Sequence, residues 1–216
     1  MLWAGAALTF WLPSVSLAEW YVGGQFGVNM PDTFSNVHLT NPTFAGGVVD
    51  ARVSDLDRQS SGVLGAKVGY FSEDRDWLGV EADFFTSQIL IKQQTVVGGV
   101  PGRTFSETLP GQSAHLSTLA FNLIVREPAL SQKFNPYGGI GPAIFVTSGN
   151  DFNVTVGINL VAGARYFVRD NLAFFGEFKY DRANVDFNGI SGTYAAQIFV
   201  VGISYHFKKP KLAEKK

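Results

Sequence analysis

The sequence predicts an all-β protein: one eight-stranded antiparallel up-and-down transmembrane β-barrel, with its apolar face toward lipid and its polar face toward the lumen. In the closing stretch Tyr194–Phe207, apolar residues such as Phe199, Val201 and Ile203 occupy every second position, and Gly202 lies between two of them. This spacing is the period of a β-strand with one apolar face. Charged residues make up only 16% of the chain, against about 25% in ordinary soluble domains.

The rest of the chain carries the same pattern and no long apolar run. The mature part lacks the roughly 18 consecutive apolar residues of a membrane-spanning helix. A closed barrel is the alternative, because its strands satisfy every backbone hydrogen bond within the lipid. Eight segments alternate, an even number as expected when both termini of the chain lie on one side of the membrane. They are Trp20–Asn29, Gly62–Phe71, Trp77–Leu90, His115–Arg126, Tyr137–Thr147, Val154–Phe167, Leu172–Val185 and Tyr194–Phe207.

The expected connections differ in length and composition. Short turns join the segments at Ser72–Asp76, Glu127–Pro136 and Asp170–Asn171, whereas Met30–Ser61 and Ile91–Ala114 are long and rich in small and polar residues. This asymmetry is typical of transmembrane barrels, whose turns are periplasmic and whose loops are extracellular.

The chain divides into three expected parts. Residues 1–18 resemble a secretory signal peptide, with an apolar core and the small residues Ser16 and Ala18 before the expected cleavage site. Residues 19–207 form the barrel. Residues 208–216, with five lysines, are expected to be a short basic periplasmic tail.

Aromatic residues gather at the turn end of the expected strands. This arrangement predicts a girdle at the membrane–water interface, where an amphipathic ring keeps its polar edge in water. The girdle residues are Trp20, Tyr21, Tyr70, Phe71, Trp77, Tyr137, Tyr166, Phe167, Tyr205 and Phe207.

The expected inward face carries eight charged residues, four basic and four acidic. A barrel of eight strands has a narrow lumen filled by side chains, so these charges must pair with one another. We expect a closed structural network; the alternatives are an ion path or a narrow passive channel. The network residues are Lys67, Glu81, Asp83, Arg126, Arg165, Glu177, Lys179 and Asp181. Inward glycines, among them Gly69 and Gly163, are expected to make room for them.

Several classes of function are excluded or disfavoured. The absence of Cys removes disulfides, thiol catalysis and Cys-based zinc sites. A net charge of −1 gives no electrostatic case for nucleic acid. His38, His115 and His206 are scattered, so we expect no metal site and no cofactor; His206 is interpreted as an interfacial polar residue.

Four short motifs together resemble the small eight-stranded outer-membrane barrels of Gram-negative bacteria, the OmpA/OmpX-like group. They are Glu19–Gly24, Pro136–Gly141, Gly163–Tyr166 and the closing Gly202-x-x-Tyr205-x-Phe207. The resemblance covers nearly all of the mature chain. It implies an outer-membrane location among lipid and lipopolysaccharide, and it implies that Gly202, Tyr205 and Phe207 form the signal read by the barrel-assembly machinery.

Function is expected to be structural or interactive rather than catalytic, with envelope integrity or surface adhesion through loops 30–61 and 91–114. The one catalytic alternative is a lipid A deacylase-like enzyme. His115 and Ser117 share one face of a strand near its loop end, but a Ser–His pair also needs an acid that orients the His. A His and a Ser at such a junction are more often ordinary polar residues of the rim.

Overall fold

The computed structural model describes residues 19–33, 35–39, 51–72, 74–100, 103–127, 133–148, 152–187 and 190–207. The predicted signal peptide at 1–18 and the predicted tail at 208–216 lie outside these ranges. None of the described residues belongs to a helix that is long and apolar enough to cross a membrane.

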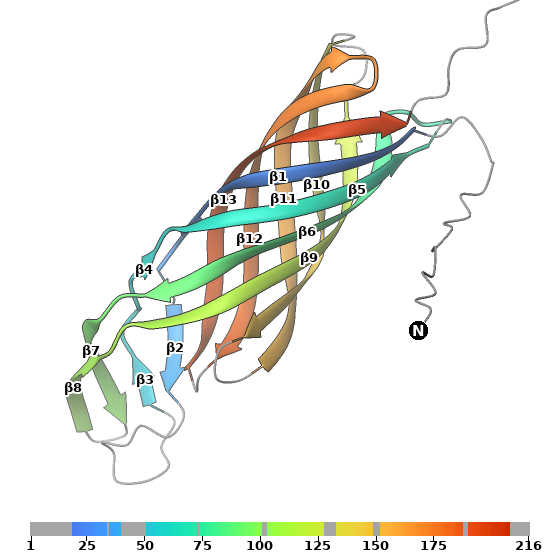
Figure 1. Ribbon diagram of the computed structural model, residues 1–216. Helices are drawn as coiled ribbons and strands as arrows, with labels where there is room; N and C mark the ends of the chain where they lie inside the picture. The colour runs from blue at the N-terminus through green and yellow to red at the C-terminus, as the bar shows by residue number, and fades with distance from the viewer. Residues whose placement is uncertain are drawn as a thin grey trace, which may run out of the picture.

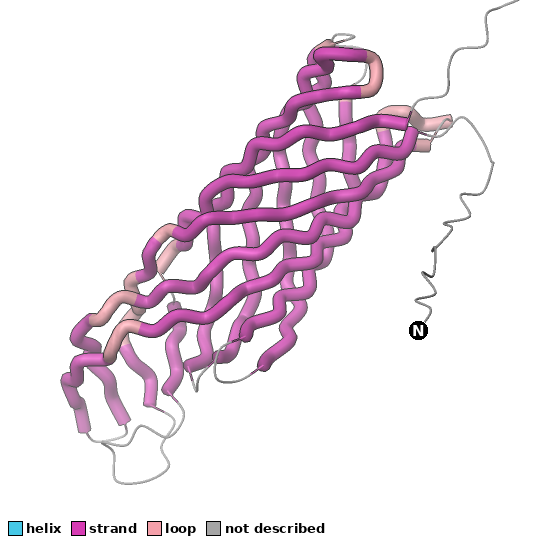
Figure 2. The backbone as a smooth tube through the Cα atoms, in the orientation of Figure 1, coloured by secondary structure: helices cyan, strands magenta, loops and turns pink. Residues whose placement is uncertain are grey.

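Eight long strands form a closed antiparallel ring (Figures 1 and 2). Each strand pairs with the next, and β13 pairs with β1 to close the ring. The eight predicted strands are therefore confirmed, with ends that differ by up to four residues. The ring strands are β1 (Glu19–Pro31), β5 (Ser61–Phe71), β6 (Leu78–Ile91), β9 (Gln112–Arg126), β10 (Phe134–Ser148), β11 (Phe152–Arg169), β12 (Leu172–Phe187) and β13 (Ile190–Phe207).

The register of the ring fixes the tilt of its strands. A path that steps between paired residues around the ring starts at Trp20 on β1 and returns to β1 at Met30, ten residues farther along. This stagger tilts the strands against the barrel axis, as closure of an eight-stranded barrel requires, and leaves a lumen just wide enough for side chains. The path runs Trp20, Tyr70, Val80, Leu123, Ile140, Leu160, Tyr180, Gln197 and Met30.

Side chains alternate between the two faces of the wall, as period two requires. On β13 the outward residues from Phe199 to Phe207 are apolar and exposed, which matches the nine to eleven or so residues that a tilted strand needs to span a bilayer. Toward the long loops, the outward face turns polar on four strands: Thr86 on β6, Ser117 on β9, Arg182 on β12 and Gln197 on β13. These residues mark one edge of the apolar band.

Two expected loops contain strands that the sequence analysis did not predict. Loop 30–61 holds β2 (Ser35–Leu39), β3 (Ala51–Val53) and β4 (Arg58–Gln59), and loop 91–114 holds the hairpin of β7 (Gln94–Val100) and β8 (Arg103–Leu109). The order β13-β2-β3-β7-β8 continues the sheet beyond the band, and Figure 1 shows these strands at one end of the barrel. We call β2, β3, β7 and β8 the lobe, and the opposite end the turn end.

The loop-end half of the lumen and the lobe share one apolar core. Val37, Leu56 and Val96 of the lobe region are fully buried, and they belong to the same cluster as Phe85 and Ile198 inside the barrel. The loop-end half of the lumen is thus packed like the core of a soluble domain, and the polar residues described below fill the other half.

Candidate functional site

Seven of the eight predicted inward charges point into the lumen, each no more than 4% exposed. They come from alternate positions of β5, β6, β11 and β12, whose other faces are turned to lipid. The eighth, Arg126, shares the inward face of β9 with Asn122 and Ile124 but lies at the turn end. Its Nη2 is 2.9 Å from Glu19 Oε2, and its guanidinium is 3.8 Å from the ring centre of the buried Phe71. Arg126 therefore faces inward as predicted, but its ion pair is with Glu19 and not with the acids of the inner network.

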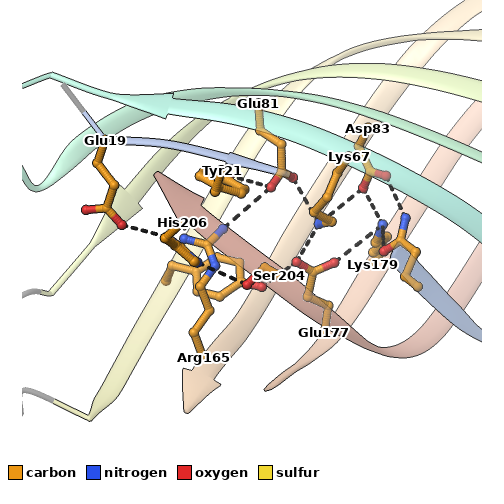
Figure 3. Close-up of polar contacts among 12 residues, drawn as sticks. Glu19, Tyr21, Lys67, Glu81, Asp83, Arg165, Glu177, Lys179, Ser204 and His206 are labelled. Carbon is orange, nitrogen blue, oxygen red and sulfur yellow. Dashed lines mark hydrogen bonds and ion pairs between the residues drawn. The ribbon is translucent and has the colours of Figure 1, made fainter. Parts of the chain in front are cut away.

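Lys67 lies at the centre of the buried network (Figure 3). Its Nζ is 2.6 Å from Glu177 Oε1, 3.1 Å from Glu81 Oε1 and 3.4 Å from Asp83 Oδ2. The ammonium group donates hydrogen bonds to Glu177 and Glu81, and the Asp83 carboxylate is close enough for an ion pair. The charge of Lys67 is offset by partners on β6 and β12.

Lys179 forms the second part of the network. Its Nζ contacts Asp83, lies 3.4 Å from Glu177 Oε2 and donates to Gln25 Oε1 at 3.0 Å. Gln25 in turn donates to Asp83 Oδ1 at 2.6 Å. The amide of Gln25 therefore bridges a cation and an anion, and the sequence analysis did not include this residue.

Arg165 lies toward the turn end of the network. Its Nη2 is 3.6 Å from Glu81 Oε2, and its guanidinium lies 4.2 Å from the ring centres of both Tyr21 and Tyr137. The guanidinium thus makes cation–π contacts with both rings. The hydroxyls of the same two rings donate hydrogen bonds to the neighbouring carboxylates, Tyr21 to Glu81 at 2.6 Å and Tyr137 to Glu177.

The aromatic residues expected in the girdle divide between the two faces of the barrel wall. Trp20, Trp77, Tyr166, Tyr205 and Phe207 are exposed, and Tyr70 is half-exposed next to Trp20. Tyr137 was expected in the girdle but is buried in the lumen, as are Tyr21, Phe71 and Phe167. On β10, Tyr137 shares its face with Gly139 and Gly141, and this glycine-rich face was the signal that could have placed it inside.

Asp181 stands apart from the ion network. It is fully buried and accepts a hydrogen bond from Asn159 Nδ2 at 2.6 Å, but no ion pair joins it to a cation among the described residues. The network therefore holds three cations and three anions rather than four of each. The cations are Lys67, Arg165 and Lys179, and the anions are Glu81, Asp83 and Glu177.

Two inward glycines make room for this layer, as expected. A Cβ on Gly69 would lie 2.2 Å from the ring of Tyr21, and a Cβ on Gly163 would lie 2.8 Å from Cγ of Glu177. Tyr21 and Glu177 could not keep their positions if a larger residue replaced the neighbouring glycine, so packing requires both glycines.

A second polar cluster closes the turn end of the lumen, and it contains His206. The ring Nδ1 of His206 lies 2.6 Å from Glu19 Oε1, and its Nε2 lies 3.0 Å from Ser204 Oγ (Figure 3). Tyr21 stacks on the same ring at 5.2 Å, and Phe167 contacts it edge-on at 4.8 Å. The interpretation of His206 as interfacial is wrong, because this side chain is fully buried.

The order Ser204, His206, Glu19 is that of a nucleophile, a base and an orienting acid. However, Ser204 is 1% exposed and His206 is 0% exposed, so no face of the hydroxyl is open to a substrate. Glu19 belongs to β1 and His206 to β13, and these two strands close the barrel. The geometry is that of a polar link across the closing seam, which we call the seam link.

His115 and Ser117, the residues of the deacylase alternative, face outward on β9. His115 is opposite Gln88 and Ser148, and Ser117 is opposite Thr86 and Val146. None of these strand partners carries a carboxylate, so the neighbouring strands supply no acid to orient His115. Among the described residues, no group of three or more His, Cys, Asp or Glu side chains is arranged so that it could hold a metal ion.

The residues of the expected assembly signal lie at the seam. Tyr205 and Phe207 face outward from β13, and their rings contact each other at 5.0 Å. Gly202 faces inward, where a Cβ would lie 2.2 Å from the carbonyl oxygen of Gly24 on β1.

Comparison with known proteins agrees with this architecture. Residues 4–207 match the family model described as outer membrane protein beta-barrel domain. The structure is similar to the outer membrane protein OprG from Pseudomonas aeruginosa, with 16% identity, a TM-score of 0.55 and coverage of 88% of this chain and 96% of that chain. It is also similar to Neisserial surface protein A, with 14% identity, a TM-score of 0.53 and coverage of 87% and 97%.

No curated protein sequence matches the chain. At these identities the two structures support the fold alone. The family model spans nearly the whole chain, however, and the chain therefore belongs to the family of outer membrane protein β-barrel domains and is located in the outer membrane of Gram-negative bacteria.

Proposed function

We propose that this protein is a non-catalytic outer-membrane barrel that presents a surface for interaction outside the cell and contributes structurally to the envelope. The observation that carries the proposal is the lobe, which continues the barrel wall beyond the polar edge of the membrane band while side chains fill the lumen beneath it. In such barrels the turn end is periplasmic and the long-loop end extracellular.

The lobe is a packed structure with its own exposed face. Val37 and Val96 are fully buried under it, whereas Thr95, Val97 and Thr104 are exposed. A surface that is held by a sheet and a core loses little conformational entropy when it binds, which favours recognition. This arrangement supports an interactive role for the two regions 30–61 and 91–114.

Arg58, on β4, connects the chain beside the lobe to the barrel wall. Its Nε donates to Asp32 O at 2.7 Å, and its Nη2 donates to Ala195 O at 2.7 Å and also to Asp32 O. The guanidinium lies 4.8 Å from the ring centre of Tyr194. Burial lowers the pKa of Arg58 to about 10, so the side chain remains charged at neutral pH and links β4 to β13 and to the residue that follows β1.

The lumen supports a structural role rather than a narrow passive channel. Lys67, Glu177 and Asp83 meet in its middle with side chains no more than 1% exposed. At the periplasmic end Tyr21 stacks on both Phe71 and His206. An ion would have to displace both layers in order to pass. The absence of an acid beside His115 likewise gives no support to a lipid A-modifying enzyme.

The remaining partners are proposed from location. The exposed apolar band would contact outer-membrane lipid, and the polar edge above it would contact lipopolysaccharide. The assembly machinery would recognise β13, where Tyr205 and Phe207 face outward beside the closing seam.

The proposal is tested by removing the lobe hairpin from the full-length protein. A two-residue turn would replace Gln94–Leu109. The new turn would join β6 directly to β9, whose pairing already extends to Ile91 and Gln112. We expect whole cells that express the variant to lose adherence to host-cell and abiotic surfaces. The barrel itself should still migrate faster on a gel when it is not boiled.

Two outcomes would contradict the proposal. One is adherence that does not change when the hairpin is removed from a barrel that still folds. The other is a stable unitary conductance of the purified protein in planar bilayers, which would favour the channel.

A further inference from the structure

A hollow of about 450 Å³ lies on the extracellular side, between β2 and the hairpin of β12 and β13. It begins two residue pairs beyond Arg182, where the outward face of β12 has already turned polar. The polar side chains that line it are Asn36, Asn184, Asp186, Ser191 and Thr193. Unlike the buried charges of the lumen, these groups are at least partly open to solvent.

Four of these side chains form a compact array on one face of the hairpin. Asn184 is opposite Thr193, and Asp186 is opposite Ser191. Thr193 Oγ1 donates to Asn184 Oδ1 at 3.1 Å. Within the described part of the chain, the Asp186 carboxylate and the Ser191 hydroxyl make no hydrogen bond. The array therefore holds donors and acceptors that the protein itself does not use.

The fifth side chain is placed by an irregularity in β2. Ser191 pairs with His38 and Thr193 with Ser35, so β2 has one residue more than β13 over this stretch. Asn36 lies in this bulge with a φ of 53°, a left-handed conformation that costs energy for a non-glycine residue. Bulges re-aim side chains and are frequent beside binding sites.

The chemistry of the hollow selects among possible ligands. Side-chain amides, hydroxyls and one carboxylate match the mixed donors and acceptors of sugar hydroxyls. Beyond Arg182, β12 pairs with β13 but no longer with β11. The lining side chains lie on the outward face of the hairpin and not along that edge, so a ligand in the hollow would be held by side chains rather than by strand pairing. Asp186 is the single charged group among the lining residues, and it would repel sulfated or phosphorylated ligands.

We propose that this hollow binds a neutral carbohydrate through Asn184, Asp186, Ser191 and Thr193, with Asn36 closing one side. The inference rests on the proposed interactive function and names its ligand class. Neutral sugars are available from two sources outside the membrane: the saccharide part of the cell's own lipopolysaccharide, and glycans on other surfaces.

The test uses the full mature protein in detergent micelles with EDTA in the buffer. Binding would be measured to immobilised neutral oligosaccharides, to their sulfated counterparts and to a lipid-free lipopolysaccharide O-chain built of neutral sugars. We expect neutral glycans to bind and sulfated ones not to bind. Binding of the O-chain would identify lipopolysaccharide as the source, and binding of the other neutral glycans would identify an external surface.

Two variants and one control locate the binding. Asp186→Ala and Asn184→Ala should each weaken binding about tenfold or more, because each removes a hydrogen-bonding group from the ligand. Gln88→Ala removes an exposed outward polar side chain on β6, on another part of the wall, and should leave binding unchanged. Faster migration without boiling would show that all three variants fold.

The proposal is overturned if no neutral glycan binds, if sulfated glycans bind better, or if Asp186→Ala binds as well as the unmodified protein. Its failure differs from failure of the proposed function. If cells still adhere through the lobe while the purified protein binds no sugar, only the carbohydrate inference fails; if adherence also survives loss of the lobe hairpin, the interactive role fails too.

Discussion

Lys67 and Glu177 meet in the lumen with Nζ and Oε1 2.6 Å apart, although 110 residues separate them in the sequence. The contact joins β5 to β12, which lie on different parts of the ring and share no backbone pairing. Glu177 also accepts from Tyr137 and lies 3.4 Å from Lys179. One carboxylate therefore serves three groups from three strands.

Removing this carboxylate should be costly. Glu177→Leu leaves Lys67 with fewer counter-ions and leaves the Tyr137 hydroxyl without its acceptor, all in a site closed to water. We expect a loss of about 3–5 kcal/mol in the free energy of unfolding, as when one partner of a buried ion pair is removed. Urea unfolding in lipid vesicles, followed by Trp fluorescence, would measure it. Unchanged resistance to urea would argue against a tightly coupled network.

Replacing Asp181, in contrast to Glu177, should not destabilise the barrel. It is as deeply buried as Glu177, but among the described residues it has no ion pair, only the hydrogen bond from Asn159. Asp181→Asn removes an ionisable group whose desolvation is poorly compensated while keeping the volume. We expect the free energy of unfolding to stay constant or to rise. A loss as large as that of Glu177→Leu would show that Asp181 belongs to the ion network after all.

The sequence predicted the ring well because the ring depends on period two. Alternation alone separates Phe199 and Val201 from Val200 and Gly202, and lipid and lumen impose the two faces along every strand. The lobe was missed because β3 has three residues and β7 reads QTVVGGV, in which glycines interrupt the pattern. Strands this short are fixed by tertiary pairing rather than by local sequence.

The errors within the site have a similar cause. Periodicity tells which residues share a face, but the type of a residue does not tell which face is inward. Tyr137 was assigned to the girdle by its aromatic ring, although its β10 face also carries Gly139 and Gly141. Gln25, uncharged, gave no signal at all, because its role depends on Asp83 and Lys179 from distant strands.

Two glycines on opposite faces form a matched pair for testing the packing of the lumen. A Cβ on Gly69 would overlap the ring of Tyr21, whereas a Cβ on Gly176 would have no heavy atom within 4 Å. Gly69→Ala should therefore destabilise the barrel by about 1–3 kcal/mol through overpacking. Gly176→Ala should be neutral or stabilise it by up to about 1 kcal/mol, because glycine weakens a strand. Equal effects in urea unfolding would contradict the assignment of the two faces.

The seam link yields the last prediction, in which a structural and a catalytic role give different results. His206 connects Glu19 on β1 to Ser204 and stacks on Tyr21, so His206→Ala breaks contacts across the strands that close the barrel. We expect the unboiled, folded band on a gel to disappear at a lower temperature in His206→Ala than in the unmodified protein. Ser204→Ala removes one hydrogen bond at the end of the link, and its effect on this temperature should be clearly smaller.

A catalytic triad would behave otherwise, because Ser204 would then be indispensable to activity while contributing little to stability. Hydrolysis of p-nitrophenyl esters by the folded protein, lost in Ser204→Ala but not in Thr118→Ala, would therefore contradict a purely structural link. Thr118 is a suitable control because it is another buried hydroxyl in the lumen, 1% exposed, that does not touch His206. The burial of Ser204 leads us to expect no hydrolysis above background in any of these proteins.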